Sequence, residues 1–427
     1  MENHLISDRS AERPFLLQSA SAQVWIQAVG RLLYQGGYGA IHFFIPLVFV
    51  NQVHLSATAV GFALGCGSLA GIIGHLLGGY LADSPAYGRK RALLLAAILS
   101  LIAAVILVET QTLVLLIFVN LVMGVSAGCY WTAADATVVD VTPSEARQKA
   151  FAILVLADSL GLALGIGGGG WLLETHPQTL FLAGVGVLLL FLGLVLVGME
   201  ETHVASHEHE QETLRGFGVA IKDRAMQLFF LVNVIFATYA AVITDILPLY
   251  FANRVAAELS MASVSNLFTW WYVGLGALIQ FPFVQLVSSL RQVSVLMISM
   301  VLWAVGFLLV WLTQTPVWMA ISLVVLSIAG AAYKPFAPAV VSELAPPSLR
   351  GIYLAISYQC WSIGYFIGPL IGGWALDRSD TFIHNAWLVA AASTIVGLLL
   401  LGVLSRQKLT NIPPERAQES AVGAGKG

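Results

Sequence analysis

The chain has 427 residues, of which 58% are hydrophobic and only 10% are charged, and its net charge is −3. Soluble domains carry about 25% charged residues, so this composition excludes a soluble enzyme and a disordered chain. The slightly negative charge also excludes the basic surface of a nucleic-acid-binding protein. An integral membrane protein remains.

Twelve apolar stretches are long enough to cross a bilayer, which takes about 20 residues per helix. They comprise residues 24–50, 57–83, 92–108, 113–137, 150–173, 180–198, 226–250, 263–287, 293–313, 317–341, 352–376 and 386–404. None alternates between polar and apolar residues as the strands of a membrane β-barrel do. We predict an all-α membrane protein with twelve transmembrane helices and polar tails over residues 1–23 and 405–427.

Lys and Arg residues gather in the loops on the side of the two tails, whereas the opposite loops contain only Arg254 and Arg378. Cytoplasmic loops of membrane proteins are enriched in these residues, so we expect both termini to be cytoplasmic. Residues 199–225 form the longest polar interruption and divide the spans into a bundle over 24–198 and a bundle over 226–404. Its histidines offer a metal-binding alternative, but a solvated linker is favoured and no metal site is predicted.

The two halves contain an internal repeat. A shift of 203 residues aligns Pro143 with Pro346, Arg147 with Arg350, and a series of glycines in span five with a series in span eleven. Both halves begin on the same side of the membrane, so the repeats are parallel. We therefore expect two six-helix bundles around a central cavity, which rock against each other to expose a midplane site to either side.

The loop after span two reads Gly79-Tyr80-Leu81-Ala82-Asp83 and then Gly88-Arg89-Lys90-Arg91. This pattern resembles the signature of the major facilitator superfamily, although four residues separate Asp83 from Gly88 where the family usually has two. The span-five glycines resemble the motif of exporters, so the twelve-span multidrug-exporter (drug/proton antiporter) branch is most similar. That branch usually has Arg in span four where this chain has Asn120. The resemblance implies the major facilitator fold in a bacterial inner membrane.

Two groups of residues are expected to control conformation and packing. A carboxylate at Asp83 can bridge to the opposite bundle and to neighbouring bases, or it can simply fix the topology. The predicted conformational switch comprises Gly79, Asp83, Gly88, Arg89, Lys90, Arg147 and Arg350. Small residues four apart give a smooth helix face for close crossing. The predicted packing set comprises Gly161, Gly165, Gly169, Gly364, Gly368, Pro369 and Gly372.

Ionisable residues inside a membrane are costly unless they are paired or hydrated. Asp158 is the favoured proton carrier because of its depth, with a fixed ion pair to Arg31 as the structural alternative. Asp245 is a candidate partner near the outer side, and Asp135, His42 and His75 complete the predicted proton-coupling set. For each of these, solvation at a mouth or ordinary helix packing remains an alternative.

Further polar and aromatic residues are expected at the cavity, since the resemblance implies that spans one, four, seven and ten line it. The candidates are Arg31, Tyr34, Tyr38, Asn120, Trp131, Asn233, Trp271, Lys334, Tyr358 and Trp361. Aromatic rings can stack on a planar or cationic amphiphile. Ordinary packing or an interfacial belt is the alternative for the rings. Lys334 can hold an anion or extend to the cytoplasm.

We predict a secondary active transporter, most simply a proton-coupled exporter of amphipathic small molecules or drugs that works by rocker-switch alternating access. The cations Arg31 and Lys334 favour a second hypothesis, uptake or exchange of a small organic anion, and lipid translocation is a third. No nucleophile–base pair and no phosphate-binding loop is found, so neither an enzyme nor an ATP-driven pump is expected. The predicted partners are a small-molecule substrate, protons and the lipid bilayer, with no nucleic acid and no cofactor, and the expected state is a monomer.

Overall fold

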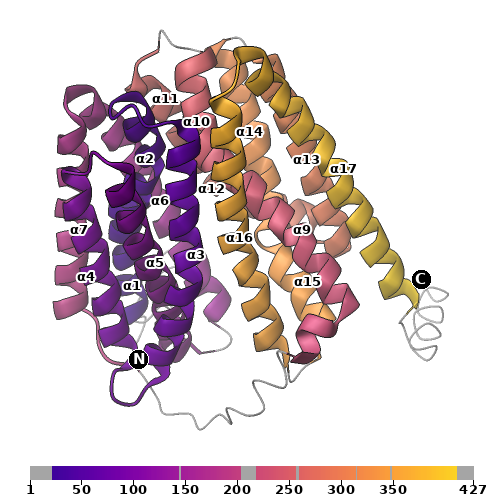
Figure 1. Cartoon of the computed structure of the whole chain (residues 1–427). Coiled ribbons are helices and arrows are strands. Elements are labelled where there is room, and N and C mark those ends of the chain that lie inside the picture. Colours follow the sequence, from indigo (N-terminus) through magenta and orange to yellow (C-terminus); the bar gives the residue numbers. More distant parts are fainter. Residues whose placement is uncertain are drawn as a thin grey trace, which may run out of the picture.

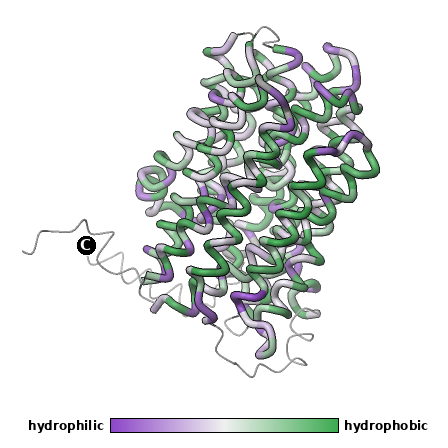
Figure 2. Tube along the Cα trace, turned by 90° about the vertical axis from the view of Figure 1, so that its left-hand side faces the viewer, coloured by the Kyte–Doolittle hydropathy of each residue, from purple (hydrophilic) through white to green (hydrophobic). Residues whose placement is uncertain are grey.

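The computed structural model describes residues 22–143, 146–202, 218–255, 259–313, 315–346 and 349–410. Within these residues twelve helical spans are long and apolar enough to cross a membrane. The predicted all-α membrane fold is therefore confirmed. Most of the residues 199–225 and of the two tails lie outside the described residues. The hydrophilic segments gather at the two ends of the molecule, and apolar segments fill the region between them (Figure 2).

The helices of the first half lie side by side on one side of the molecule (Figure 1). Span one consists of α1 (Ala22–Tyr34), the π-helix η1 (Gln35–Gly39) and α2 (Ala40–Asn51). Spans two to six are α3 (Ala57–Asp83), α4 (Gly88–Val108), α5 (Leu113–Val141), α6 (Arg147–Thr175) and α7 (Pro177–Val197).

The second half repeats this order on the other side of the molecule. Span seven consists of α9 (Arg224–Ala241), η2 (Val242–Ile246), α10 (Leu247–Tyr250) and η3 (Phe251–Val255). Span eight consists of α11 (Met261–Leu267), η4 (Phe268–Gly274) and α12 (Leu275–Val287). The remaining spans are α13 (Gln292–Leu312), α14 (Pro316–Tyr333) with α15 (Phe336–Leu344), α16 (Arg350–Leu376) and α17 (Asp380–Thr410).

Several spans differ from the predicted continuous helices. The tenth span breaks at Lys334 and Pro335, because Pro cannot donate the backbone hydrogen bond that an α-helix needs. The local sequence also accounts for the π-helical turns η1 and η2. Three of the five residues of η1 are Gly, which stabilises an α-helix poorly, and Pro248 is the second residue after η2. Its ring nitrogen cannot bond to the carbonyls of Ile243 and Thr244, so the regular ladder is interrupted there.

The glycine series of the repeat makes equivalent contacts in the two halves. A Cβ atom on Gly161 of α6 would collide with the carbonyl of Leu32, so α6 packs directly on the backbone of span one. In the second half, Gly364 of α16 faces Ala237 of span seven in the same way. The repeat detected in the sequence therefore corresponds to a repeated packing: span five packs on span one, and span eleven packs on span seven in the same way.

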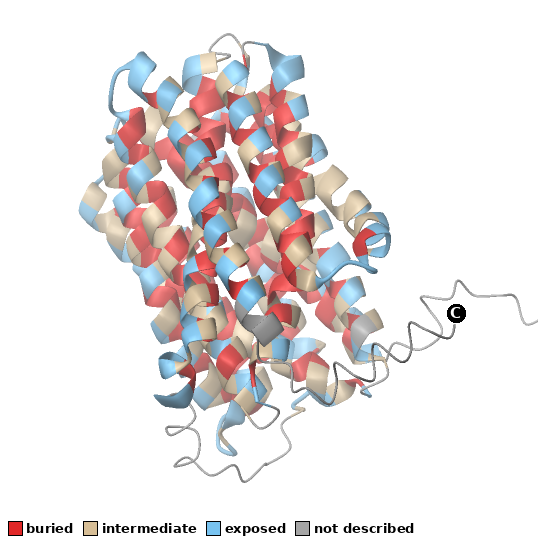
Figure 3. Ribbon diagram, turned by 90° about the vertical axis from the view of Figure 1, so that its right-hand side faces the viewer, coloured by how far each residue is buried: buried red, intermediate tan, exposed pale blue. Residues whose placement is uncertain are grey.

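The two halves contact each other at the end that we predict to be extracellular, hereafter the outer end. The carboxylate of Asp377 accepts hydrogen bonds from the backbone amides of Ala57 (2.9 Å) and Thr58 (2.8 Å) at the start of α3. The Nδ2 of Asn253 donates to Oδ1 of Asn51 at 2.8 Å. Exposed and buried residues alternate along the helices of the second half (Figure 3), as expected where one helix face meets lipid.

Candidate functional site

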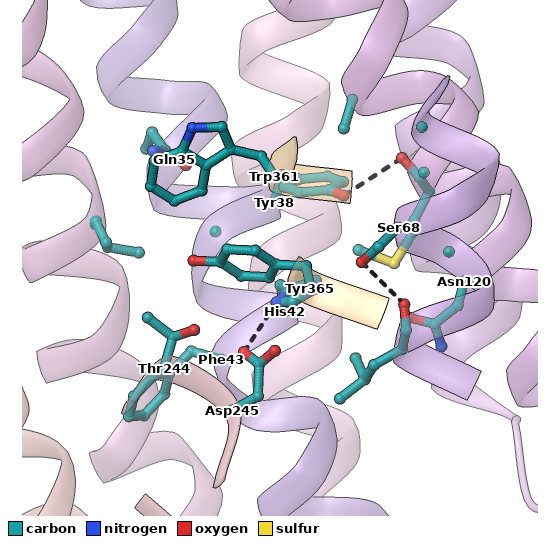
Figure 4. A pocket seen from close by; sticks show the side chains of 18 of the residues that line it. Gln35, Tyr38, His42, Phe43, Ser68, Asn120, Thr244, Asp245, Trp361 and Tyr365 are labelled. Atoms are coloured by element: carbon teal, nitrogen blue, oxygen red, sulfur yellow. Dashed lines mark hydrogen bonds and ion pairs between the residues drawn. The ribbon is translucent and has the colours of Figure 1, made fainter. Parts of the chain in front are cut away.

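A cavity of about 330 Å³ lies between the two halves. Its walls combine small, polar and aromatic residues from spans one, two, four, five, seven, eight and eleven. The aromatic residues are Tyr38, Phe43, Trp131, Phe268, Tyr272, Trp361 and Tyr365. Of the Asp, Glu, His, Lys and Arg residues that the structure describes, only His42, His75 and Asp245 line it. Figure 4 shows His42, Asp245, Tyr365 and Trp361 around this space.

Three π-helical turns shape the cavity. Its lining includes Gln35 and Tyr38 from η1, Thr244 and Asp245 from η2, and Tyr272 from η4. A π-helical turn places one more residue in a turn than an α-helix does and often occurs at functional sites. The turns therefore bring residues to the cavity that regular helical periodicity would direct elsewhere. Our list of candidate cavity residues does not include Gln35, Thr244 or Tyr272, although the Gly-rich segment and Pro248 were available signals.

Asp245 and His42 approach each other across the two halves of the protein, in a contact that is an ion pair only when His42 is protonated. Their Oδ1 and Nδ1 atoms are 3.7 Å apart, and Asp245 is only 1% exposed. Neither carboxylate oxygen of Asp245 has a hydrogen-bond partner among the described residues. Burial without hydrogen bonds makes a charged carboxylate expensive, so this group is poised to accept a proton or a cation from the cavity.

A second charged cluster lies outside the lining of the cavity. The Arg31 guanidinium donates from NH1 to Oδ2 of Asp158 at 3.0 Å and also forms an ion pair with Asp135. Its Cζ atom lies 5.0 Å from the centre of the Trp131 ring. The Arg31 and Asp158 side chains are 5% and 16% exposed, whereas that of Asp135 is 53% exposed. The structure thus contains the ion pair with Arg31, which was the structural alternative to a proton-carrier role for Asp158.

Lys334 approaches the same cluster from the second half. It lies at the break between α14 and α15 and is exposed. Lys334 interacts electrostatically with Asp158 across the interface between the halves. It does not belong to the cavity lining.

Aromatic rings connect the Arg31 cluster with the Asp245 pair. Tyr34 stacks on Tyr130 with ring centres 3.6 Å apart and on Tyr38 at 5.0 Å. Tyr38 in turn lies parallel to the ring of His42 at 6.3 Å. Tyr34 is fully buried in this stack and does not line the cavity, in contrast to our prediction. The reason is that Tyr130 of α5 covers its face.

Three other predicted cavity residues do not line the cavity. Asn233 is buried and donates to Ser357 at 2.8 Å while accepting from the hydroxyl of Tyr333 at 2.6 Å. Trp271 is 43% exposed, because η4 turns its neighbour Tyr272 toward the cavity instead. Tyr358 is exposed away from the lining.

The remaining cavity predictions agree with the lining. Trp131 and Trp361 form part of it, as does Asn120, whose Nδ2 donates to the Leu116 carbonyl at 2.8 Å. His75 also lines the cavity, with Nδ1 at 3.0 Å from Oγ1 of Thr132.

The part of the predicted switch around Asp83 and Arg89 makes its contacts within the first half in this conformation. Asp83 forms an ion pair with Arg89, whose Nε also donates to Oδ2 of Asp140 at 3.0 Å. The carboxylate of Glu201 accepts from the backbone amides of Arg89 (2.7 Å) and Lys90 (3.1 Å). Gly88 permits this turn through a φ of 77°, which side chains disfavour.

Other members of the predicted switch have separate positions. Arg147 donates from Nε to the carbonyl of Thr142 and from NH2 to that of Val139, both at 3.3 Å. Arg350 is the first residue of α16. A Cβ atom added to Gly79 would lie 3.7 Å from a methyl group of Thr132. The expected bridge from Asp83 to the opposite half is not among the contacts that the structure describes.

Comparison with known proteins gives a consistent picture. A model of the Major Facilitator Superfamily matches residues 28–270 and 246–425. A Na(+), Li(+), K(+)/H(+) antiporter of Planococcus maritimus is 21% identical over 377 residues, which cover 81% of this chain and 87% of that protein. Multidrug resistance protein 2 of Bacillus subtilis (strain 168) is 23% identical over 389 residues, with 85% and 91% covered. The nucleoside transporter NupG has the same fold, with a TM-score of 0.77 at 14% identity over 90% of this chain and 100% of that chain.

Proposed function

This chain belongs to the Major Facilitator Superfamily of membrane transporters, and from this premise we propose that it exports amphipathic, cationic small molecules in exchange for protons. One observation carries the proposal. The buried carboxylate of Asp245, without hydrogen-bond partners among the described residues, faces an aromatic cavity between the two halves.

The lining of the cavity favours a lipophilic cation. Aromatic faces attract cations, and this attraction strengthens when the cation leaves water. Asp245 supplies a negative charge at one end of the cavity, and Trp131 and Trp361 supply apolar surface elsewhere in it. One of the two relatives is named as an antiporter of cations and protons, which supports proton exchange, and the other is named as a multidrug resistance protein, which supports a drug-like substrate.

Exchange follows from competition for one carboxylate. A cationic substrate stabilises the charged form of Asp245, whereas an empty cavity favours the protonated form. Substrate and proton therefore bind in turn, and rocking of the halves carries each to the opposite side. His42 joins this step because it contacts Asp245 from the other half, so their pairing depends on how the halves are oriented.

The Arg31 cluster provides a second protonatable position toward the end that we predict to be cytoplasmic. Arg31 has two carboxylate partners, so either Asp158 or Asp135 can accept a proton while the other still neutralises the guanidinium. Anion exchange has less support, because these two carboxylates neutralise Arg31. Among the described Asp and Glu residues only Asp245 lines the cavity, and its ionised form would repel an anion.

The test uses proteoliposomes that contain a pH-sensitive dye, with tetraphenylphosphonium as the lipophilic cation. For the wild type we expect the cation to dissipate an imposed proton gradient. Asp245→Asn removes the exchangeable charge and should abolish this response, whereas Glu109→Gln, a matched change at an exposed acid, should preserve it. An unchanged response in Asp245→Asn would refute the proposal. Exchange of a labelled organic anion without proton movement would instead support the anion hypothesis.

Asp158→Asn separates the two acidic positions. If Asp158 is the second proton position, this variant should still bind the cation, because Asp245 is intact, but transport it without net proton movement. Loss of cation binding in Asp158→Asn would contradict the assignment of the substrate site to the Asp245 end of the cavity.

A further inference from the structure

A second hollow, separate from the Asp245 cavity, lies at the exposed apolar surface of the second half. We refer to it as the α16–α17 groove, and its volume is about 630 Å³. Its floor includes Thr238 and Val242 of span seven and Phe307 of α13. Its walls are α16, with Ile371 and Trp374, and α17, with residues from Phe382 to Ser393.

The dimensions of the groove match one leaflet of a bilayer. Phe382 and Ser393 are eleven residues apart on α17, which corresponds to about 16 Å along the helix. The hydrocarbon core of a bilayer is about 30 Å thick, so the groove spans roughly half of it. Its apolar rim is open, since Ile371, Val389 and Phe382 are 57%, 69% and 42% exposed.

The interior of the groove offers little to a polar ligand. The hydroxyls of Tyr239 and Ser393 bond to each other at 2.6 Å, and Oγ of Ser393 also bonds to the carbonyl of Ala390 at 2.7 Å. These groups are thus satisfied within the protein. A hydrocarbon chain fills such a space more favourably than a polar solute does.

The outer end of the groove has a different character. Arg378 lies beside it, with Cζ 4.9 Å from the centre of the Trp374 ring, and Ser379 and Thr381 contribute to the lining. Arg254 at the same end is neutralised by Asp380. The guanidinium of Arg378 has no carboxylate within ion-pair distance among the described residues and is exposed. Its charge is therefore complementary to a phosphate at the membrane surface.

We propose that the α16–α17 groove binds one phospholipid of the outer leaflet, with an acyl chain along the groove and its phosphate at Arg378. The lipid contacts span seven at Thr238 and Val242, and Val242 begins the π-helical turn that carries Asp245. The bound lipid therefore packs against η2, the same turn from which Asp245 faces the cavity.

The test is photocrosslinking in nanodiscs with phosphatidylglycerol that carries a diazirine near the end of one chain. We expect the crosslinks, mapped by mass spectrometry, to concentrate on the groove around Phe307 and Val389. Ala390→Phe fills the groove and should reduce crosslinking there at least fivefold. Ala392→Phe is the matched control, because Ala392 is exposed on the same helix but outside the groove, and it should leave the yield unchanged.

A second variant tests the phosphate contact without changing the groove. Arg378→Gln alters an exposed side chain and should reduce the crosslinking yield severalfold. Unlabelled phosphatidylglycerol should compete with the probe, whereas glycerol phosphate should not, because a free phosphate lacks the chain. Crosslinks spread evenly over the exposed apolar surface, or equal yields from Ala390→Phe and Ala392→Phe, would refute the proposal. Competition by glycerol phosphate alone would identify an anion site and also refute a lipid site.

Discussion

Replacement of Arg31 by Met should destabilise the protein by about 3–5 kcal/mol, the cost of removing one partner from a buried ion pair. The Arg31 and Asp158 side chains are 5% and 16% exposed, and their atoms are 3.0 Å apart. At this separation the attraction amounts to about 5 kcal/mol for an effective dielectric constant of 20. Without Arg31, Asp158 has lost this attraction but remains buried.

The two carboxylates should respond differently to neutralisation. Asp135 is 53% exposed, so water compensates for much of its interaction, and Asp135→Asn should cost about 1 kcal/mol or less. Asp158→Asn should cost more, because its environment offers less water. In the double variant Arg31→Met with Asp158→Asn, no buried charge remains unpaired, and at least about 2 kcal/mol of the loss should be recovered.

The assay is the free energy of unfolding in lipid bicelles by steric trapping, measured for the wild type, the three single variants and the double variant. A double variant whose loss equals the sum of the two single losses would refute the ion-pair account. Equal losses in Asp135→Asn and Asp158→Asn would show that exposure does not set the contributions.

Three further outcomes are expected. Gly161→Ala should destabilise the protein by about 1–3 kcal/mol, because the added Cβ meets a backbone carbonyl. Gly168→Ala on the same helix places its Cβ in open space, so thermal unfolding should show a lower stability for the Gly161 variant than for this control. Asp377→Ala removes hydrogen bonds at the outer contact between the halves. Their loss should destabilise the closed outer end by about 1 kcal/mol, which shifts the ratio of outward-open to outward-closed molecules about fivefold toward the open state. Spin-label distances across the outer end measure this shift, and unchanged distances would contradict it. Gly88→Ala should cost about 1–2 kcal/mol because of its φ of 77°, and equal thermal stability of this variant and the wild type would argue against strain there.

The twelve spans could be predicted because the thickness of the bilayer imposes the length and composition of each helix. The repeat also predicted where glycines permit close packing, and Gly161 and Gly364 occupy equivalent contacts. Individual cavity residues were harder to predict. Cavity-facing and lipid-facing positions are both rich in aromatic residues, so Trp271 could not be distinguished from Tyr272 by composition.

The rotation of residues around the helix axis explains other differences between the predicted and the observed cavity residues. Regular α-helical periodicity through span one would place Tyr34 and Tyr38 on the same face, whereas η1 changes the rotation of the chain between Tyr34 and Ala40. Tyr34 consequently packs under Tyr130 while Tyr38 lines the cavity. The pairing of Arg31 with Asp158 was foreseen as one alternative, but the contribution of Asp135 required the three-dimensional arrangement of three separate spans.

The π-helical turn η2 has a consequence for how this transporter tolerates changes in length. A π-helical turn holds one residue more than the corresponding α-helical turn, so removal of one residue there can leave an α-helical turn that lacks only the hydrogen bond that Pro248 cannot donate. The helix beyond the deletion would keep its orientation, whereas a deletion in α13 would rotate every later residue of that helix by about 100°. Deletion of Val242 should therefore leave an assembled protein whose Asp245 has a changed orientation. Insertions and deletions at such turns offer a route by which a related chain can exchange its cavity residues without redesigning its helix contacts.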